Sequence, residues 1–583
     1  LPCRRLPHNL MSLMDFSRKE ILIMRRFSQV KLGLLLFINL VSTACFASTQ
    51  QLEALLEPLS IGERANVDNT QIISAKLLSR VYQVRQYQAL WEDKDYAGTL
   101  LDVIKSADEE GLAKEDYHYP KLVELYQQLS ASNWQDEYRS SVFEVLLTDG
   151  IITYAIHLLN GKVNPSMLGK TWNYDEAHLD FDTTLKQLEE HIKAHTVAEA
   201  ITGLAPKIAP YHQLKQYLAQ YKDLAARYPF TTIPYTEVIK PGSTSPSVQS
   251  IATRLKELGY LAASSPAENS AAVNEPLTYD STLEAAVRQF QTDHSLKADG
   301  VIGAGTMAAL NVPYTQRVEQ IRINLERARW LSANLPANYL LVNLAGYELL
   351  LFKDNNLNWR TDIIIGKIDA KTPLFKSKLK YVVVNPTWTV PRSISTEIIN
   401  HLRKDPDYLQ KKHFKVVEAS GTPVDARGID WHSMTRKNFP YWFVQGPGED
   451  NSLGLVKFIF PNQYSIYLHD TPSKNLFEQT NRAFSHGCIR VKDPLVLADK
   501  LLSANANWSS ETLNRKLAEG KTENLFLDQP LDILIMYWTV TIKNGKIKFY
   551  NDIYTRDPVL IEALNRPTYE GVLADDGLLN TLE

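Results

Sequence analysis

Cysteine is scarce in this chain of 583 residues, which contains Cys3, Cys45 and Cys488. The first two lie before or within an N-terminal segment that we expect to be removed, so the mature protein keeps one thiol. A single thiol has no disulfide partner, and this excludes a disulfide-bonded scaffold. A lone cysteine is usually buried and unreactive, so any other role for Cys488 has to be argued from its neighbours.

An excess of charge of either sign is also lacking. The chain has 63 Lys and Arg against 66 Asp and Glu, a net charge of -3. This balance gives no reason to expect nucleic acid or an anionic membrane surface as a partner. Hydrophobic residues make up 44% and charged residues 22%, as in folded domains. The length predicts about three or four domains, each with its own core.

The apolar run near the N-terminus, Leu32–Val41, is too short for a comfortable membrane span. Basic residues precede it and small residues up to Ala47 follow it, which is typical of an export signal over residues 24–47. We expect cleavage after Ala47. Two alternatives stay open: the segment is retained as an inner-membrane anchor, or Cys45 is lipidated, although Ser42 is unfavourable three positions before such a cysteine.

Residues 48–240 are expected to form a helical scaffold domain. Leucines recur at helical spacing over Leu52–Leu59, and a long periodic segment over Phe143–Leu159 is ended by Asn160 and Gly161. Residues that carry chemistry do not cluster in this region.

A small domain is expected over residues 241–312, after the turn Pro241–Pro246. Two periodic helices are expected, with a loop at residues 263–275 between them, and a third helix starts near Thr306. The domain resembles the three-helix peptidoglycan-binding domain in these residues: Phe290, Gln291, Leu296, Asp299, Gly300, Ile302, Gly303, Thr306 and Leu310. The resemblance implies glycan-strand binding, but the loop departs from the compact form of that domain.

A connecting helix over residues 313–337 leads to a β-rich domain over residues 338–555. Its predicted strands include a hairpin around Ala345-Gly346 and a second hairpin around Asn544-Gly545. Further strands are expected in these segments: Ile363–Ile365, Tyr381–Val384, Ser465–Leu468 and Ile533–Ile542. Residues 392–445 are helix- and loop-like, which indicates a capping or lid insertion, and residues 556–583 are expected to be a tail.

The chemistry is concentrated in two segments, Ser485–Arg490 and Tyr467–Asp470. A free thiol is only partly ionised at neutral pH, and His469, 19 positions before Cys488, is a suitable base for it. Backbone amides around Gly487 and Cys488 could form an oxyanion hole. A metal site is the rival interpretation, but the histidines and Cys488 lack Cys-x-x-Cys or His-x-x-x-His spacing and a fourth ligand. We expect no metal and no cofactor.

These two segments resemble the signature of the L,D-transpeptidase family. The similarity extends to Asn385–Trp388, Pro447-Gly448, Asn451–Gly454, Val456–Phe458 and His469–Pro472. It resembles the large periplasmic branch, with a helical scaffold, a peptidoglycan-binding domain and a capping subdomain. The resemblance implies a multidomain α+β fold, a periplasmic location and crosslinking of peptidoglycan stem peptides, with carbapenems as acylating inhibitors.

The resemblance also implies roles for individual residues. Cys488 matches the acylated nucleophile, His469 the general base, and Gly487 with Cys488 the oxyanion hole. A backbone carbonyl near Asp470 is expected to orient the imidazole. The remaining candidates, each with its alternative, are His486 (supporting, or a structural hydrogen bond), Arg490 (bracing the site or binding a substrate carboxylate, or a structural ion pair), Tyr467 and Trp388 (substrate cleft, or core packing), Asp470 (substrate or imidazole, or a turn) and Ser485 (a turn or cap).

Three functions remain to be separated. The first is a 3→3 crosslinking transpeptidase that releases D-alanine from a tetrapeptide donor. The second keeps the thioester but passes the acyl group to a protein lysine, a free D-amino acid or water. The third is a wall-binding scaffold without activity. If His469 is the base, activity should rise as the imidazole deprotonates, near pH ~6.5 unless the site moves its pKa.

Overall fold

The computed structural model describes residues 48–60, 66–169, 172–174, 180–262, 277–332, 335–506 and 508–568. The expected export signal, the loop at 263–275 and residues 569–583 lie outside the described residues. By its internal contacts the chain divides into two compact units, residues 1–101 with 118–149, and residues 102–117 with 150–583. Each unit is described separately below.

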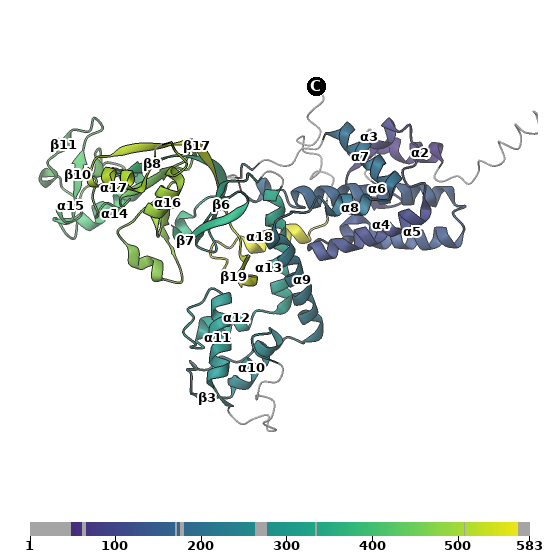
Figure 1. The fold of residues 1–583 in the computed structure, drawn as a ribbon, viewed down its shortest axis with the longest axis horizontal. Coiled ribbons are helices and arrows are strands. Elements are labelled where there is room, and N and C mark those ends of the chain that lie inside the picture. Colours follow the sequence, from purple (N-terminus) through teal and green to yellow (C-terminus); the bar gives the residue numbers. More distant parts are fainter. Residues whose placement is uncertain are drawn as a thin grey trace, which may run out of the picture. The chain divides into compact units, whose positions relative to one another are not determined.

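The first unit is a bundle of helices (Figure 1). Its helices are α2 (Thr49–Ser60), α3 (Ala75–Val84), α5 (Tyr119–Ala131) and the parts up to 101 and 149 of α4 (Lys94–Lys105) and α6 (Glu137–Asn160); the hairpin β1 (Asn66–Val67) and β2 (Thr70–Gln71) lies between α2 and α3. Leu52, Leu56 and Leu59 are buried on one face of α2, as the leucine spacing predicted.

Helix α6 is long and apolar enough to cross a membrane, the one such helix in the described part of the chain. However, 83% of its most apolar window is buried inside the protein. Such burial is typical of a core helix, which is hydrophobic on all sides and packs against its neighbours. The sequence prediction of a helix over Phe143–Leu159 is confirmed.

The second unit begins with helices that lead into the small domain. They are η1 (Ser106–Glu110), η2 (Lys114–Tyr117), η3 (Pro165–Leu168), α7 (Phe181–Ala194), α8 (Val197–Thr202) and α9 (Ala209–Arg227). The small domain consists of β3 (Thr244–Ser245), α10 (Ser247–Glu257), β4 (Leu277–Thr278), α11 (Ser281–Asp293) and α12 (Ala304–Leu310). Its core contains Val248, Ile251, Leu283, Val287 and Phe290, from the two periodic segments that predicted α10 and α11.

Helix α13 (Tyr314–Ser332) connects the small domain to the β-rich domain and packs along α9. Residues 557–565, expected to be part of a tail, instead form α18 (Asp557–Asn565) beside α13. Leu560 and Leu564 of this helix are buried, and Arg327 of α13 donates to Asp557 at its start at 2.7 Å. Sequence periodicity over nine residues is too short to reveal such a contact.

The β-rich domain is built on a sheet that closes on itself. Its strand order is β15-β7-β16-β14-β13-β8-β17-β5-β6, and β6 also pairs with β7. The strands are β5 (Tyr339–Asn343), β6 (Glu348–Lys353), β7 (Asn356–Gly366), β8 (Phe375–Val384), β13 (Val456–Ile459), β14 (Leu468–His469), β15 (Ala483–Ser485), β16 (Ile489–Val491) and β17 (Glu523–Met536); η5 (Ile368–Ala370), η7 (Lys474–Glu478), α16 (Pro494–Leu502) and α17 (Ser510–Ala518) lie between them.

Most predicted strands are confirmed, and two need correction. The expected strand over Ser465–Leu468 begins only at Leu468, because Ser465 has a backbone φ of 56° that an extended strand cannot contain. The expected strand over Ile533–Ile542 is two strands, the end of β17 and then β18 (Val540–Lys543). The hairpin at Asn544-Gly545 is confirmed, with β18 paired to β19 (Lys546–Phe549).

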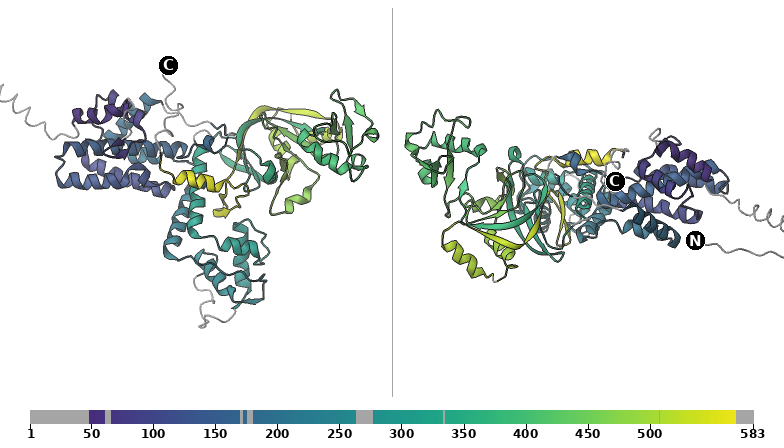
Figure 2. Two further views of the ribbon diagram at one scale, coloured as in Figure 1. Left: turned by 180° about the vertical axis from the view of Figure 1, so that it is seen from behind. Right: turned by 90° about the horizontal axis from the view of Figure 1, so that it is seen from above.

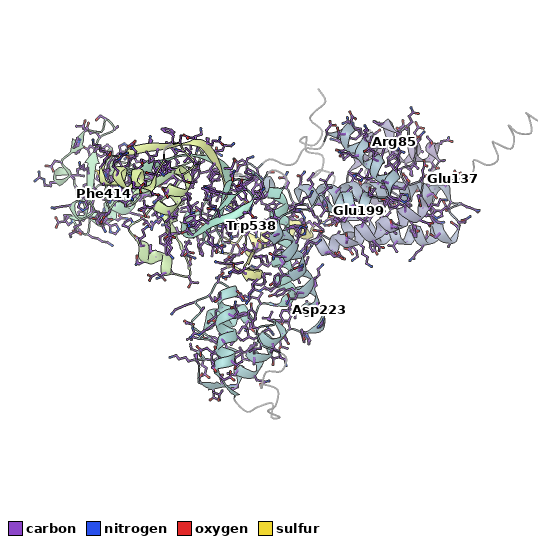
Figure 3. All side chains as sticks on the ribbon, viewed as in Figure 1. Arg85, Glu137, Glu199, Asp223, Phe414 and Trp538 are labelled. Carbon is purple, nitrogen blue, oxygen red and sulfur yellow. The ribbon has the colours of Figure 1, made fainter. Side chains whose placement is uncertain are left out.

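The predicted insertion is a separate folded layer. Its sheet has the order β11-β10-β12-β9, from β9 (Trp388–Thr389), β10 (Phe414–Val417), β11 (Pro423–Val424) and β12 (Trp442–Gln445), with α14 (Arg392–Leu402), α15 (Tyr408–Lys411) and η6 (Ala426–Gly428). Both views of Figure 2 show these elements grouped apart from the closed sheet, and Figure 3 labels Phe414 among them. The insertion has its own core, in which Phe443 is fully buried.

This core predicts a local stability effect. Phe443 stacks on Phe439 with ring centroids 4.8 Å apart, so Phe443→Ala should lower the free energy of unfolding of the insertion by about 3–5 kcal/mol. Trp431, whose ring centroid is 6.0 Å from that of Phe443, supplies a fluorescence signal for urea unfolding. The matched control is Phe526→Ala, since Phe526 is 62% exposed, and it should change stability by about 0.5 kcal/mol or less. Equal effects of the two changes would contradict a separate insertion core.

Candidate active site

Two short strands bring the candidate residues together. β14 pairs with β16 in parallel, with Leu468 opposite Ile489 and His469 opposite Arg490. Leu468 and Ile489 are buried in the hydrophobic core. Because side chains alternate along strands, their neighbours Tyr467, His469, Cys488 and Arg490 share the other face. Residues 19 positions apart in sequence are thus adjacent in space.

The His469 imidazole is held in one orientation. It is buried, and its Nδ1 lies 2.5 Å from the carbonyl oxygen of Asp470. A carbonyl can only accept a hydrogen bond, so in the neutral ring Nδ1 carries the proton and Nε2 has a free lone pair. The expected orienting carbonyl near Asp470 is therefore present, and Nε2 is the atom able to act as a base.

The Asp470 carboxylate holds the segment that supplies this carbonyl. It accepts from the backbone N–H of Leu455 at 2.9 Å and of Thr471 at 2.7 Å, and from Lys474 Nζ at 2.5 Å. A side chain at Gly454 would overlap this carboxylate, which explains the glycine. Since its oxygens are engaged in this way, Asp470 is placed to position His469, while its predicted contact with substrate stays a prediction.

The Cys488 thiol lies among polar groups of the preceding segment. Sγ donates to the carbonyl of Ser465 at 3.6 Å, and the Tyr467 hydroxyl also hydrogen-bonds to it. Trp388, from β9, in turn hydrogen-bonds to that hydroxyl. Tyr467 and Trp388 are therefore placed at the thiol, and their role in a substrate cleft stays a prediction. In the described part of the chain no hydrogen bond joins Sγ to His469, and such contacts often form only with substrate bound.

Ser485 clamps the turn that carries the thiol. Its Oγ donates to the carbonyl of Cys488 at 2.5 Å and accepts from the N–H of Gly487 at 3.1 Å. Gly487 has a φ of 115°, which a residue with a side chain rarely adopts. Because the Gly487 N–H is engaged, the two-amide oxyanion hole predicted for Gly487 and Cys488 is not open in this structure. Among the described hydrogen bonds, the Cys488 N–H has no acceptor and is the available donor.

The charges around the site set its protonation state. Burial lowers the pKa of His469 to about 3, helped by the positive charges of Arg490 and Lys457. Burial raises the pKa of the Cys488 thiol, although hydrogen bonds from Tyr467 and the same two cations oppose this. At neutral pH the pair is a neutral thiol beside a neutral imidazole. The site thus moves the predicted histidine titration well below pH 6.5.

His486 contacts charged residues and not, in any described hydrogen bond, the thiol. Its Nε2 lies 2.7 Å from Glu397 Oε1 on α14 of the insertion, and Lys367 Nζ lies 3.7 Å from the same oxygen. These contacts fit a structural hydrogen bond better than a catalytic role, because they link the turn before Cys488 to the insertion. In the residues that the structure describes, no three His, Cys, Asp or Glu side chains are grouped to hold a metal ion.

Sequence reasoning missed two contributions to the site. Lys457 lies opposite His469 on β13, and it belongs to a segment that carried the family resemblance without a role of its own. The strand register would have been needed to place it there. Glu397 gave no signal, because a single carboxylate in a charged insertion is usually solvated.

Three segments of the chain match family models. Residues 337–524 match the "L,D-transpeptidase catalytic domain", residues 244–310 a "Putative peptidoglycan binding domain" and residues 76–218 a "Scaffold domain". All candidate site residues lie within the first match. The family resemblance and the fold class inferred from the motifs are thereby confirmed.

A curated protein of Haemophilus influenzae named "Putative L,D-transpeptidase" is 38% identical over 221 residues, which is 38% of this chain and 45% of that protein. The chain therefore aligns with less than half of that relative's length.

Two solved structures share low sequence identity with this chain. An L,D-transpeptidase from Xylanimonas cellulosilytica has 16% identity over 52% of this chain and 99% of that chain, with a TM-score of 0.16. A fused Zn-dependent amidase/peptidase/peptidoglycan-binding protein from Clostridium acetobutylicum has 14% identity over 52% and 100%, with a TM-score of 0.14. Scores this low carry no argument.

The neutral thiol predicts the pH dependence of alkylation. Because burial raises the pKa of Cys488, its thiolate fraction at pH 7 should be a few per cent or less, and it should rise steadily through pH 9. The rate of modification by iodoacetamide, followed by mass spectrometry from pH 5.5 to 10, should rise with it. A plateau already reached below pH 7 would instead reveal a preformed thiolate–imidazolium pair.

Proposed function

We propose that this chain, whose catalytic domain belongs to the L,D-transpeptidase family, forms 3→3 crosslinks between peptidoglycan stem peptides through a thioester on Cys488. The observation that carries the proposal is the placement of Cys488, Tyr467 and His469 on one face of two paired strands within the matched domain. The peptidoglycan-binding and scaffold matches in the same chain support a substrate in the cell wall.

The first step is acylation. Sγ of Cys488 attacks the carbonyl of the third residue, a diamino acid, of a tetrapeptide donor. Nε2 of His469 takes the thiol proton during the attack and returns it to the leaving amine, so that D-alanine departs and a thioester remains. The N–H of Cys488 is the donor available for the developing oxyanion.

The second step transfers the acyl group. The side-chain amine of the third residue in another stem attacks the thioester, gives its proton to Nε2, and the proton passes to the departing Cys488 sulfur. An amide crosslink forms and the enzyme is regenerated. Water competes with the amine for the thioester, and the insertion, joined to the active-site turn through Glu397 and His486, is suited to exclude it.

The remaining parts of the proposal concern location and ligands. The export signal at residues 24–47 would place the protein in the periplasm, either cleaved after Ala47 or retained as an anchor. The small domain would hold a glycan strand. Carbapenems would acylate Cys488 as donor analogues.

Defined stem peptides test the function directly. With a tetrapeptide donor and excess acceptor stem, residues 48–583 should release D-alanine and form a 3→3 dimer, and Cys488→Ala should form neither. A carbapenem should add once to the wild-type protein and not to the variant, by intact-protein mass spectrometry. Hydrolysed tripeptide as the sole product would favour another acceptor. No adduct on a folded wild-type protein would favour the wall-binding scaffold.

The low pKa of His469 gives a second prediction. Because the imidazole stays neutral down to about pH 3, acidification from pH 7.5 to 5 removes no base. The value of kcat/KM for D-alanine release should therefore remain level over this range, while His469→Gln should lower it by about 10²–10⁴-fold. A half-maximal rate between pH 6 and 7 would show that the imidazole titrates as an ordinary histidine.

A further inference from the structure

Two cations flank the candidate base across the sheet. Arg490 of β16 lies opposite His469 of β14, and Lys457 of β13 lies opposite His469 on its other side. The three side chains form one row on the face that carries Cys488. Lys457 also contacts Tyr467, because its Nζ lies 3.8 Å from the centroid of the Tyr467 ring.

Among the described residues, neither cation has an anionic partner. Burial lowers the pKa of both Lys457 and Arg490, and the one group that opposes this shift is Cys488. In the described part of the chain no hydrogen bond or ion pair joins Lys457 Nζ to a carboxylate, and Arg490 Nε is buried without a hydrogen-bond partner. Both residues are partly exposed, so a ligand can reach them.

Two other cations of this chain, both buried more deeply, are each paired with a carboxylate. Arg329 meets Glu326 at 2.8 Å, and Lys162 meets Asp116 at 2.6 Å. Burying a charge that has no partner costs free energy, so unpaired buried charges are found mainly at functional sites. The row at His469 is therefore preorganised for a negative group that arrives with the substrate.

We propose that Lys457, with Arg490 beside it, forms an anion subsite that receives a carboxylate of the donor peptide next to Cys488, and that Lys457 thereby selects acidic over amidated donors. This proposal rests on the proposed function for the identity of the donor. The subsite itself does not, because any small acid that reacts with the thiol should sense it.

Alkylation with two probes isolates this charge effect. Iodoacetate and iodoacetamide both form an S–C bond to Cys488 and release iodide, but only the first carries a carboxylate. The ratio of their rates cancels any change in thiolate fraction. Lys457→Met should lower this ratio about tenfold, and Lys457→Arg should keep it within about twofold of wild type. The ratio in the wild type should also fall as salt is raised.

A matched control excludes a change in net charge alone. Lys378→Met removes a lysine of β8 that is 63% exposed, and it should leave the ratio unchanged. An unchanged ratio in Lys457→Met, or an equal fall in Lys378→Met, would overturn the anion subsite. Because no transpeptidation is measured, this result stands apart from the proposed function.

Donor peptides then connect the subsite to the reaction. Lys457→Met should lower kcat/KM about tenfold for a tetrapeptide with free carboxylates, with a matching rise in KM. Two further peptides are amidated at the terminal or at the side-chain carboxylate. The peptide whose kcat/KM no longer responds to Lys457→Met identifies the carboxylate that Lys457 binds. If both amidated peptides remain as sensitive as the free acid, Lys457 does not select donors. If the alkylation ratio responds but no donor is processed, the proposed function fails while the subsite holds.

Discussion

The parallel pairing of β14 with β16 is the contact on which the candidate site depends. It joins two strands of two and three residues, and their inward side chains Leu468 and Ile489 are fully buried. Anchoring one face in the core presents the other face as a fixed array of reactive side chains. A shift of the register by one residue would turn His469 inward, so the hydrophobic core determines the geometry of the chemistry.

The electrostatics of this array favour general-base catalysis over a preformed ion pair. Positive charge on both sides of His469 disfavours an imidazolium, and burial disfavours a thiolate until substrate arrives. A neutral pair reacts slowly with adventitious electrophiles, because the thiolate is the nucleophile. Under the proposed function, reactivity then depends on a substrate that aligns the thiol with Nε2 and brings a negative group to Lys457 and Arg490.

Much of this could be predicted from the sequence, and the limits have physical reasons. The leucine spacing of α2 and the Asn544-Gly545 turn are local signals, and both led to correct elements. The motif at Cys488 drew attention to the thiol and to His469, which the paired strands place on one face, and their catalytic roles stay predictions. The position of Lys457 opposite His469 could not be predicted, because it comes from the register between β13 and β14. The state of the Gly487 amide depended on a serine hydroxyl whose direction no sequence pattern reveals.

Strand β17 has a consequence for the order of folding. It lies between β8 and β5, pairing with both, yet it is the last strand of the closed sheet in the chain. Until Glu523–Met536 are available, β8 and β5 remain open edges and the sheet cannot close. Its contacts with β5 span almost two hundred positions, for example Met536 with Asn343, and such long-range closure is slow. A chain synthesised from its N-terminus therefore exposes β14 and β16 before the sheet around them is complete, and the candidate site becomes organised only once β17 is available.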